Sequence, residues 1–229
     1  QYAWMTNCDL PEGRYEFGAD GKMLQGIVDK DGVLYYYENG NGVEKGLVCV
    51  DGSYYFAQFM GEVVVDQVFY AWETNCDLPA GQYEFGADGK MLQGIVEKED
   101  GLYYYENGVG VEKGLFEYEG GYYFSEYAGK LRVSETFYAW VSSCDVPAGT
   151  YEFGADGKML DGIVNKDGKY YYYELGNGVE AGLVYVDGYY YFAQYGGELV
   201  VSQDFYVYNA NGLLVETTYT FDEYGRIVG

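Results

Sequence analysis

The apolar positions along this chain fall in short runs that polar, glycine-rich segments separate. Residues 15–24 read as the aromatic run YEF, the turn-like segment GADG and a second run KML, and residues 35–43 read as YYY, ENGNG and V. Aromatic and β-branched residues suit a pleated strand, and glycine, asparagine and aspartate favour the tight turns between strands. No segment keeps an apolar period of 3.6 residues over several helical turns. The pattern therefore predicts a succession of short β-hairpins.

This hairpin pattern repeats every 68 residues. The segment FYAW at 69–72 recurs at 137–140, and parts of it stand at 2–4 and 205–206. The spacing does not drift, so no insertion or deletion separates the copies. We expect repeat 1 at residues 1–68, repeat 2 at 69–136, repeat 3 at 137–204 and a partial C-terminal capping repeat at 205–229. Because residue 1 falls inside a motif and no signal peptide precedes it, we expect the sequence to be an excerpt from a longer protein.

A single hairpin leaves its apolar face uncovered, and isolated two-stranded hairpins are marginally stable in water. Stacking of successive hairpins covers that face and gives contacts mainly between neighbours in the sequence. The sequence therefore predicts an all-β fold, an elongated β-hairpin solenoid of tandem repeats with an aromatic core. The residues expected in this core are Tyr15, Tyr83, Tyr151, Phe17, Phe85 and Phe153.

Composition and charge narrow the possible partners. Aromatic residues make up 20% of the chain, which argues against disorder. The formal net charge is −24 with only 13 basic residues, so binding to nucleic acid or to an anionic membrane surface is not expected. The chain has no histidine, which excludes histidine-based catalytic triads and most catalytic zinc sites. No run approaches the roughly 20 apolar residues that a membrane helix needs.

The repeated segment resembles the cell-wall-binding repeats of bacterial surface proteins. Its clearest copy, residues 151–162, reads YEFGADGKMLDG: an aromatic run, a short turn, a glycine two residues before a methionine, and a closing glycine. The same pattern is found in the choline-binding repeats of Gram-positive surface proteins, the glucan-binding repeats of glucosyltransferases and the C-terminal repeats of large clostridial toxins. The resemblance covers nearly the whole chain. It implies a β-hairpin solenoid in an extracellular, cell-surface or secreted protein.

One position departs from the choline-binding pattern. In those repeats a tryptophan follows the closing glycine and helps to enclose the ammonium group of choline. Here the corresponding residues are Ile27, Ile95, Ile163, Leu47, Leu115 and Leu183. A cation site of this kind needs aromatic faces within about 6 Å. The resemblance therefore implies the fold and a surface setting, but not choline as the ligand.

Exposed aromatic rings are the best candidates for binding. Side chains along a strand alternate between its two faces, so the middle ring of the run at 35–37 should point outward if its neighbours point inward. Tyrosine and tryptophan rings stack on sugars and anchor protein interfaces. The predicted ligand-binding residues are Trp4, Trp72, Trp140, Tyr36, Tyr104 and Tyr172. The alternative is a cross-strand aromatic ladder that only stiffens the sheet.

Catalysis and metal binding are not expected from the remaining residues. Glycosidase chemistry needs two acids across one cleft, whereas most acids here recur in every copy, as Glu16, Glu84 and Glu152 do. We expect these acids to solvate the outer face. Residues 29–32, DKDG, resemble the start of a calcium loop, but position 12 of that loop would be Gly40 instead of Glu. We therefore expect an ordinary hairpin turn there, and neither a catalytic residue, a metal nor a cofactor.

The cysteines give little information about disulfides. Cys8, Cys76 and Cys144 share one register and so lie a full repeat apart, whereas a disulfide needs Cα atoms within about 7 Å. Cys49 has no counterpart and could reach Cys8 or Cys76 only if those segments meet. We expect all four to be small buried apolar residues.

Together these features predict a non-catalytic bacterial surface binding module. Its tandem repeats would bind a glycan or cell-wall polymer through exposed aromatic rings, and several weak equivalent sites would raise the avidity. An adhesin that binds a host protein, such as a mucin or an immunoglobulin, is the main alternative. A passive structural stalk that only spaces other domains is the third possibility. None of the three involves nucleic acid or membrane insertion.

Overall fold

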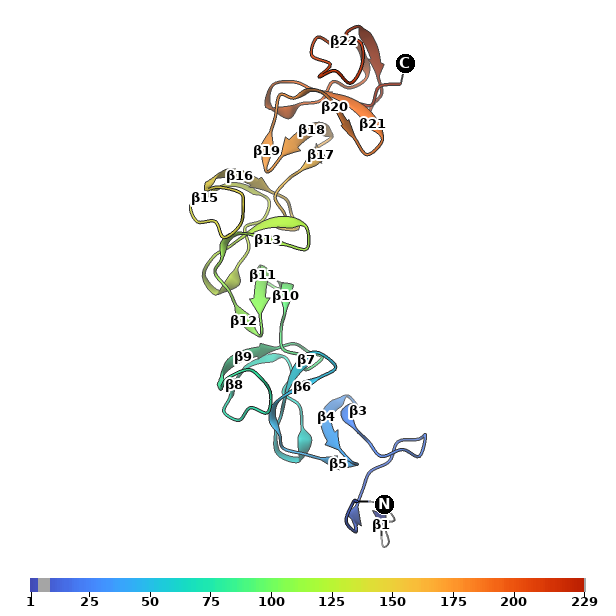
Figure 1. Ribbon diagram of the computed structural model, residues 1–229, viewed down its shortest axis with the longest axis vertical. Helices are drawn as coiled ribbons and strands as arrows, with labels where there is room; N and C mark the ends of the chain where they lie inside the picture. Colours follow the sequence, from blue (N-terminus) through green and yellow to red (C-terminus); the bar gives the residue numbers. More distant parts are fainter. Residues whose placement is uncertain (4–8, 229) are drawn as a thin grey trace. The chain divides into compact units, whose positions relative to one another are not determined.

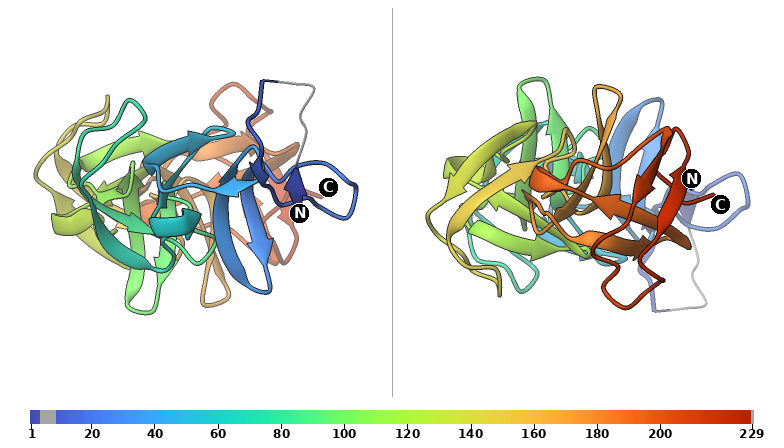
Figure 2. Two further views of the ribbon diagram at one scale, coloured as in Figure 1. Left: turned by 90° about the horizontal axis from the view of Figure 1, so that it is seen from below. Right: turned by 90° about the horizontal axis from the view of Figure 1, so that it is seen from above.

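Short antiparallel strands account for most of the regular structure. The computed structural model describes residues 1–3 and 9–228, and among these it contains 23 β-strands, three single-turn 3-10 segments and no α-helix. Figures 1 and 2 show the strands as short arrows joined by turns and loops. Each sheet has two or three strands, and strands that pair follow each other in the sequence. The all-β fold of tandem hairpins predicted from the sequence is confirmed.

The chain divides into two compact units. One comprises Gln1–Val96 and Tyr104–Val111, and the other comprises Glu97–Tyr103 and Glu112–Gly229. This division falls inside the segment assigned to repeat 2, so the repeat boundaries drawn from the sequence remain predictions. Within residues 1–3 and 9–228, no helix is long and apolar enough to span a membrane.

The strands in the first half of the chain form hairpins separated by loops. They are β1 (Tyr2–Ala3), β2 (Gly13–Arg14), β3 (Gly26–Lys30), β4 (Val33–Glu38), β5 (Asn41–Gly42), β6 (Gly46–Val50), β7 (Ser53–Ala57), β8 (Gln67–Ala71), β9 (Gly81–Phe85), β10 (Gly94–Lys98), β11 (Gly101–Glu106) and β12 (Val109–Gly110). The 3-10 turn η1 (Phe59–Gly61) follows β7.

The same order continues in the second half. The strands are β13 (Gly114–Tyr118), β14 (Gly121–Ser125), β15 (Glu135–Ala139), β16 (Gly149–Phe153), β17 (Gly162–Lys166), β18 (Lys169–Glu174), β19 (Asn177–Gly178), β20 (Gly182–Val186), β21 (Tyr189–Ala193), β22 (Gln203–Tyr206) and β23 (Thr218–Phe221). The 3-10 turns η2 (Tyr127–Gly129) and η3 (Tyr195–Gly197) follow β14 and β21. Equivalent hairpins therefore recur every 68 residues, as β3–β4, β10–β11 and β17–β18 do.

The turn residues adopt the backbone conformations that the sequence predicts. Between β3 and β4, Asp31 and Gly32 have φ angles of 56° and 86°, which an Asp-Gly pair adopts readily. The amide of Gly32 donates a hydrogen bond of 2.8 Å to the Asp29 carboxylate. The segment DKDG is therefore a hairpin turn. In the described part of the chain, no three Asp, Glu, Cys or His side chains are grouped so that they could hold a metal ion.

Each copy buries a cluster of side chains between two consecutive hairpins. Leu47 and Phe56 of the β6–β7 hairpin pack with Ala71 and Phe85 of the β8–β9 hairpin, and all four are almost fully buried. Two equivalent clusters contain Leu115, Phe124, Ala139 and Phe153, and Leu183, Phe192, Val207 and Phe221. Full burial of a large apolar side chain contributes about 1.5–3 kcal/mol. Neighbouring hairpins share this burial, as the solenoid prediction requires.

Five of the six residues expected in the core are buried, and Phe17 is the exception. Phe17 is 40% exposed, whereas its equivalents Phe85 and Phe153 are each 1% exposed. Phe85 is covered by Leu47 and Phe56, which precede it in the sequence. Phe17 belongs to none of the core clusters found among residues 1–3 and 9–228.

A loop in each copy is tied back to the preceding hairpin. The amide of Leu47 donates to the Glu73 carbonyl at 2.8 Å, and the amide of Asn75 donates to the Leu47 carbonyl at 2.7 Å. These bonds form an isolated parallel bridge between Leu47 and Thr74, and an equivalent bridge joins Leu115 to Ser142. The bridge fixes the loop after β8 against β6.

Three of the cysteines are free thiols. Cys49 is exposed, and Cys76 and Cys144 are half-buried. Burial is the main cause that raises the pKa of the Cys76 thiol. The expectation of a buried side chain is therefore wrong for Cys49, and Cys8 lies outside the described residues.

Candidate ligand-binding site

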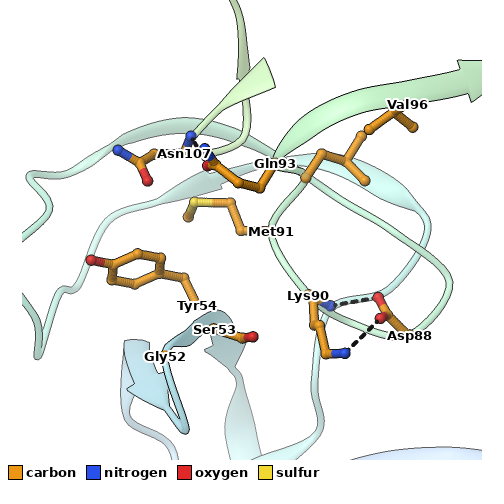
Figure 3. A pocket seen from close by; sticks show the side chains of 10 residues that line it. Gly52, Ser53, Tyr54, Asp88, Lys90, Met91, Gln93, Val96 and Asn107 are labelled. Carbon is orange, nitrogen blue, oxygen red and sulfur yellow. Dashed lines mark hydrogen bonds and ion pairs between the residues drawn. The ribbon is translucent and has the colours of Figure 1, made fainter. Parts of the chain in front are cut away.

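A pocket of about 420 Å³ opens beside the start of β7 (Figure 3). Its lining comes from three segments: the β6–β7 turn, the chain from the end of β9 into β10, and the turn between β11 and β12. The lining residues are Gly52, Ser53, Tyr54, Asp88, Lys90, Met91, Leu92, Gln93, Val96 and Asn107. All of them belong to the first of the two units. The volume lies within the roughly 300–1,000 Å³ typical of small-molecule sites.

Tyr54, Met91, Leu92 and Val96 form the apolar part of the pocket, in which Tyr54 and Met91 lie next to each other. The backbone amide of Met91 donates a hydrogen bond of 2.8 Å to the carbonyl of Tyr54, which holds the two residues side by side. The Tyr54 hydroxyl donates a hydrogen bond of 2.8 Å to the Asp77 carboxylate. This hydrogen bond, with a smaller effect from burial, raises the pKa of Tyr54 to about 12. The ring therefore stays neutral at physiological pH and its position is fixed.

Polar groups surround this apolar part. The carboxamide oxygen of Gln93 accepts a hydrogen bond of 2.7 Å from the backbone amide of Asn107, so the β11–β12 turn is fixed against the pocket. The Lys90 ammonium lies 3.2 Å from the Asp88 carboxylate. Figure 3 shows Gln93 and Asn107 on one side of Met91, and the Asp88–Lys90 pair on the other. The pocket therefore offers hydrogen-bonding groups around one ring and one thioether, with its positive charge balanced by a carboxylate.

The predicted residues Trp72 and Trp140 lie outside this pocket, in clusters of three rings. The Trp72 ring centroid is 5.0 Å from that of Phe56 and 5.4 Å from that of Phe69. Trp140 makes equivalent contacts with Phe124 and Phe137. Trp72 and Trp140 are 55% and 51% exposed, so each ring packs on the core and leaves much of its surface to solvent. Trp4 lies outside the described residues.

The predicted residues Tyr36, Tyr104 and Tyr172 do not form an outward row. Tyr104 is only 5% exposed, and Tyr36 and Tyr172 are half-buried. Tyr36 packs on a small cluster that contains Tyr55 and Val63, because the η1 turn folds back over this part of β4. The expectation of an exposed ring is therefore wrong for Tyr104. A ligand-binding role for these three tyrosines remains a prediction.

The hydroxyls of Tyr36 and Tyr172 are bonded within their own strands. Tyr36 donates to Glu38 at 2.7 Å, and Tyr172 donates to Glu174 at 2.8 Å. Burial, followed by the hydrogen bond to glutamate, raises the pKa of Tyr36 and of Tyr172 to about 12. These groups are hydrogen-bonded inside the repeat.

The recurring glutamates bind lysine and tyrosine. Glu16 accepts a hydrogen bond of 2.6 Å from the Lys30 ammonium, which also donates to the Tyr37 hydroxyl at 3.1 Å. The bond from Lys30 is the main cause that lowers the pKa of Glu16. Glu152 is bonded in the same way to Lys166 and Tyr173. These acids therefore stabilise the hairpins in addition to facing solvent.

The pocket residues Tyr54, Gln93 and Asn107 were not predicted from the sequence. A signal was nevertheless present, because an amide or carboxylate side chain recurs 14 residues before each turn of this kind. Gln93 bonds to the amide of Asn107, and Asp161 bonds to the amide of Leu175. This spacing marks the hairpin that places Gln93 beside the pocket.

Comparisons with known proteins identify similar solved structures. No protein-family model and no curated protein match the sequence. Choline-binding protein F from Streptococcus pneumoniae is 22% identical, covers 89% of this chain and 78% of its own, and has a TM-score of 0.33. The choline-binding domain of CbpL from Streptococcus pneumoniae is 19% identical, covers 90% of this chain and 98% of its own, and has a TM-score of 0.34.

A third similar structure is the modular autolysin LytC from Streptococcus pneumoniae in complex with a synthetic peptidoglycan ligand. It is 17% identical and covers 87% of this chain, with a TM-score of 0.39, and this chain spans 46% of its length. The resemblance to choline-binding and cell-wall-binding repeats that the sequence indicates is therefore also found among solved structures. The likeness is one of fold.

Proposed function

We propose that this chain is a non-catalytic binding module of a bacterial surface protein, and that it recognises a neutral glycan or cell-wall polymer. The observation that carries the proposal is the pocket beside Tyr54. Its ring and Met91 offer an apolar surface, and hydrogen-bonding groups of Ser53, Gln93 and Asn107 surround it. A pyranose ring has the complementary arrangement, with apolar C–H faces and a rim of hydroxyls.

The charges favour a neutral ligand. The chain carries a net charge of −24, which repels polyanions. Among the described residues that line the pocket, Tyr54 is the only aromatic one, whereas a cation site gains from several ring faces within about 6 Å. A neutral sugar meets neither difficulty.

The exposed tryptophans supply further contacts in this proposal. Trp72 and Trp140 each present a half-exposed ring on a rigid aromatic base. A polymer that fills the pocket with one sugar could stack other sugars on these rings. Several weak contacts of this kind raise the avidity for a long chain over that for a single sugar.

The test compares two asparagines that occupy equivalent turns. Asn39 and Asn107 have the same φ angle of 48°, and each donates its backbone amide to a glutamine 14 residues earlier. Only Asn107 lines the pocket. On an array of neutral bacterial polysaccharides followed by calorimetry, we expect Asn107→Ala to weaken binding about fivefold, the effect of one lost hydrogen bond, and Asn39→Ala to leave it unchanged. Equal effects of the two substitutions would contradict the proposal.

Binding to a host protein is the competing function, and three exposed aromatic tips favour it. Phe59, Tyr127 and Tyr195 stand at equivalent 3-10 turns and are 72%, 85% and 88% exposed. Rings of this kind are common anchors of protein interfaces. Capture of a serum or mucus protein that no sugar displaces, and that is lost on Tyr127→Ser and Tyr195→Ser, would establish this function in place of the first. Failure to bind any glycan or protein would leave the role of a stalk.

A further inference from the structure

Three successive copies contain the same backbone hydrogen bond at the position of the pocket. The two residues that this bond joins are called the frame. The amide of Met91 donates to the Tyr54 carbonyl at 2.8 Å, and the amide of Met159 donates to the Tyr122 carbonyl at 2.7 Å. The third copy has the corresponding bond from Ile227 to Tyr190, at 2.9 Å. Differences between the three sites therefore arise from their side chains.

The first site is open because its lysine, Lys90, is paired with Asp88 and does not cover the frame. Ser53 begins β7, and the Lys90 ammonium lies 3.2 Å from the Asp88 carboxylate (Figure 3). The Lys90 side chain is 51% exposed. The space beside Ser53 and Tyr54 forms the pocket of about 420 Å³.

The second site is largely filled by its own lysine. Gly121 stands where Ser53 stands in the first site, and Lys158 stands where Lys90 stands. A Cβ atom on Gly121 would lie 2.6 Å from Cε and 3.0 Å from Cδ of Lys158, so the lysine side chain occupies the place of the missing side chain. The space that remains, lined by Tyr122 and Met159, is about 90 Å³.

The third site is occupied by a stacked arginine. The guanidinium carbon of Arg226 lies 4.2 Å from the ring centroid of Tyr189 and 5.2 Å from that of Tyr224. Tyr189 stands at the position of Ser53, and Tyr224 at that of Asp88. A side chain of the protein therefore covers the frame in this copy too.

We propose that the residue at positions 53, 121 and 189 determines whether each site can take a ligand, so that of these three sites only the one at Ser53 binds a neutral oligosaccharide. Glycine lets the lysine fold over the frame, tyrosine holds the arginine there by stacking, and serine keeps the lysine out. This inference rests on the proposed function and adds that equivalent copies differ in their capacity to bind.

The backbone permits a direct test at Gly121. Its φ lies outside the left-handed region, so serine fits the backbone, and the atoms that a new Cβ would displace belong to the flexible end of Lys158. Gly121→Ser should move Lys158 aside and open the second site. Lys158→Ala should open it without any change at residue 121, and Ser53→Gly should let Lys90 close the first site.

The ε-methyl groups of Met91 and Met159 report on the two sites separately in NMR spectra of the full chain. With chitotetraose and isomaltotetraose as probes, we expect the Met91 signal of the wild type to shift and that of Met159 to stay. In Gly121→Ser and in Lys158→Ala both signals should shift, and the number of probe molecules bound per chain should rise from one to two. Ser53→Gly should weaken the Met91 response about tenfold.

The outcomes separate this inference from the proposed function. A wild-type chain in which both methionine signals respond overturns the inference and leaves the function intact. A wild-type chain in which neither methionine signal responds to the probes contradicts the proposal that a neutral glycan binds this pocket. The reactivity of the two lysines then decides the inference.

Reductive methylation should modify Lys158 more slowly than Lys90 in the wild type and equally fast in Gly121→Ser. An unchanged rate in that variant overturns the inference, and Lys158→Ala gives a second reading if Gly121→Ser folds poorly.

Discussion

At the scale of single residues, equivalent positions in the copies can carry different side chains on the same backbone conformation. The turn residue before glycine is Asn39 in the first copy, Asn107 in the second and Leu175 in the third, with φ angles of 48°, 48° and 44°. Left-handed backbone costs an ordinary L residue about 1–2 kcal/mol, and asparagine tolerates it better because its short polar side chain can bond locally. Leu175 therefore carries strain that its equivalents avoid.

Replacement of this leucine should stabilise the protein. We expect Leu175→Asn to raise the free energy of unfolding by about 1 kcal/mol, because the side chain is 44% exposed and gives up little packing. Urea denaturation followed by circular dichroism measures the change. The reverse substitution, Asn107→Leu, is the matched control and should lower the free energy by a similar amount. A less stable Leu175→Asn variant would contradict the account of strain at this turn.

The sequence predicted some residue positions well and others poorly. Asp31-Gly32 was correctly assigned to a turn, because both residue types favour positive φ angles locally. Tyr104 was expected to be exposed but is buried, because alternation along one strand does not reveal what covers each of its faces. The pocket was missed for a related reason: Tyr54, Gln93 and Asn107 are far apart in the sequence and meet only through hairpin packing.

At the scale of elements, close packing between a turn and a strand accounts for one glycine in the first copy and one in the third. Gly61 ends the η1 turn with a φ of 84°, and a Cβ atom there would lie 2.4 Å from the Tyr36 carbonyl oxygen. Gly197 ends η3 with a φ of 82°, and a Cβ atom there would lie 2.3 Å from the Tyr172 carbonyl oxygen. The glycine therefore lets the 3-10 turn lie directly on a strand of an earlier hairpin, β4 for η1 and β18 for η3.

This contact can be tested against a glycine that has the conformation without the contact. Gly52 has a φ of 78°, but no atom lies within 4 Å of the position of its Cβ. We expect Gly52→Ala to cost about 1 kcal/mol from backbone strain alone, and Gly61→Ala to cost about 2–4 kcal/mol because the turn must also move away from β4. Thermal unfolding of the two variants gives the comparison. Equal losses would show that the close approach adds nothing.

The hairpins themselves were predictable, and some connections between them were not. Alternating aromatic runs and Gly-rich turns indicate β3–β4 and its equivalents directly. The parallel bridge between Leu47 and Thr74 has no such local signal, because it joins a strand to a loop through backbone groups.

At the scale of the whole molecule, the abundance of tyrosine should make stability depend on alkaline pH. Tyrosine ordinarily ionises near pH 10, whereas the pKa values of Tyr36, Tyr54 and Tyr172 are raised to about 12. For Tyr36 and Tyr172 burial is the main cause, and for Tyr54 it is the bond to Asp77. The unfolded chain therefore loses these protons first, so stability is fully present below pH 10 and falls as the pH rises to about 12.

Absorbance at 295 nm measures this difference. In guanidinium chloride all tyrosines should titrate together near pH 10, whereas in the folded protein a fraction should titrate about two units higher. The melting temperature should fall between pH 10 and pH 12, with no change between pH 7 and pH 9 from these groups. Coincident titration curves for the folded and unfolded chains would contradict the burial and hydrogen bonding that raise these pKa values.

The small size of the sheets has a mechanical consequence. No sheet in the described part of the chain has more than three strands. Paired strands, such as β3–β4, β6–β7 and β13–β14, run antiparallel. The two ends of such a hairpin emerge on the same side, away from its turn. Tension on the polypeptide would peel its hydrogen bonds apart one by one instead of shearing them together, so a protein tethered to a cell and pulled by flow would lengthen in small steps at low force.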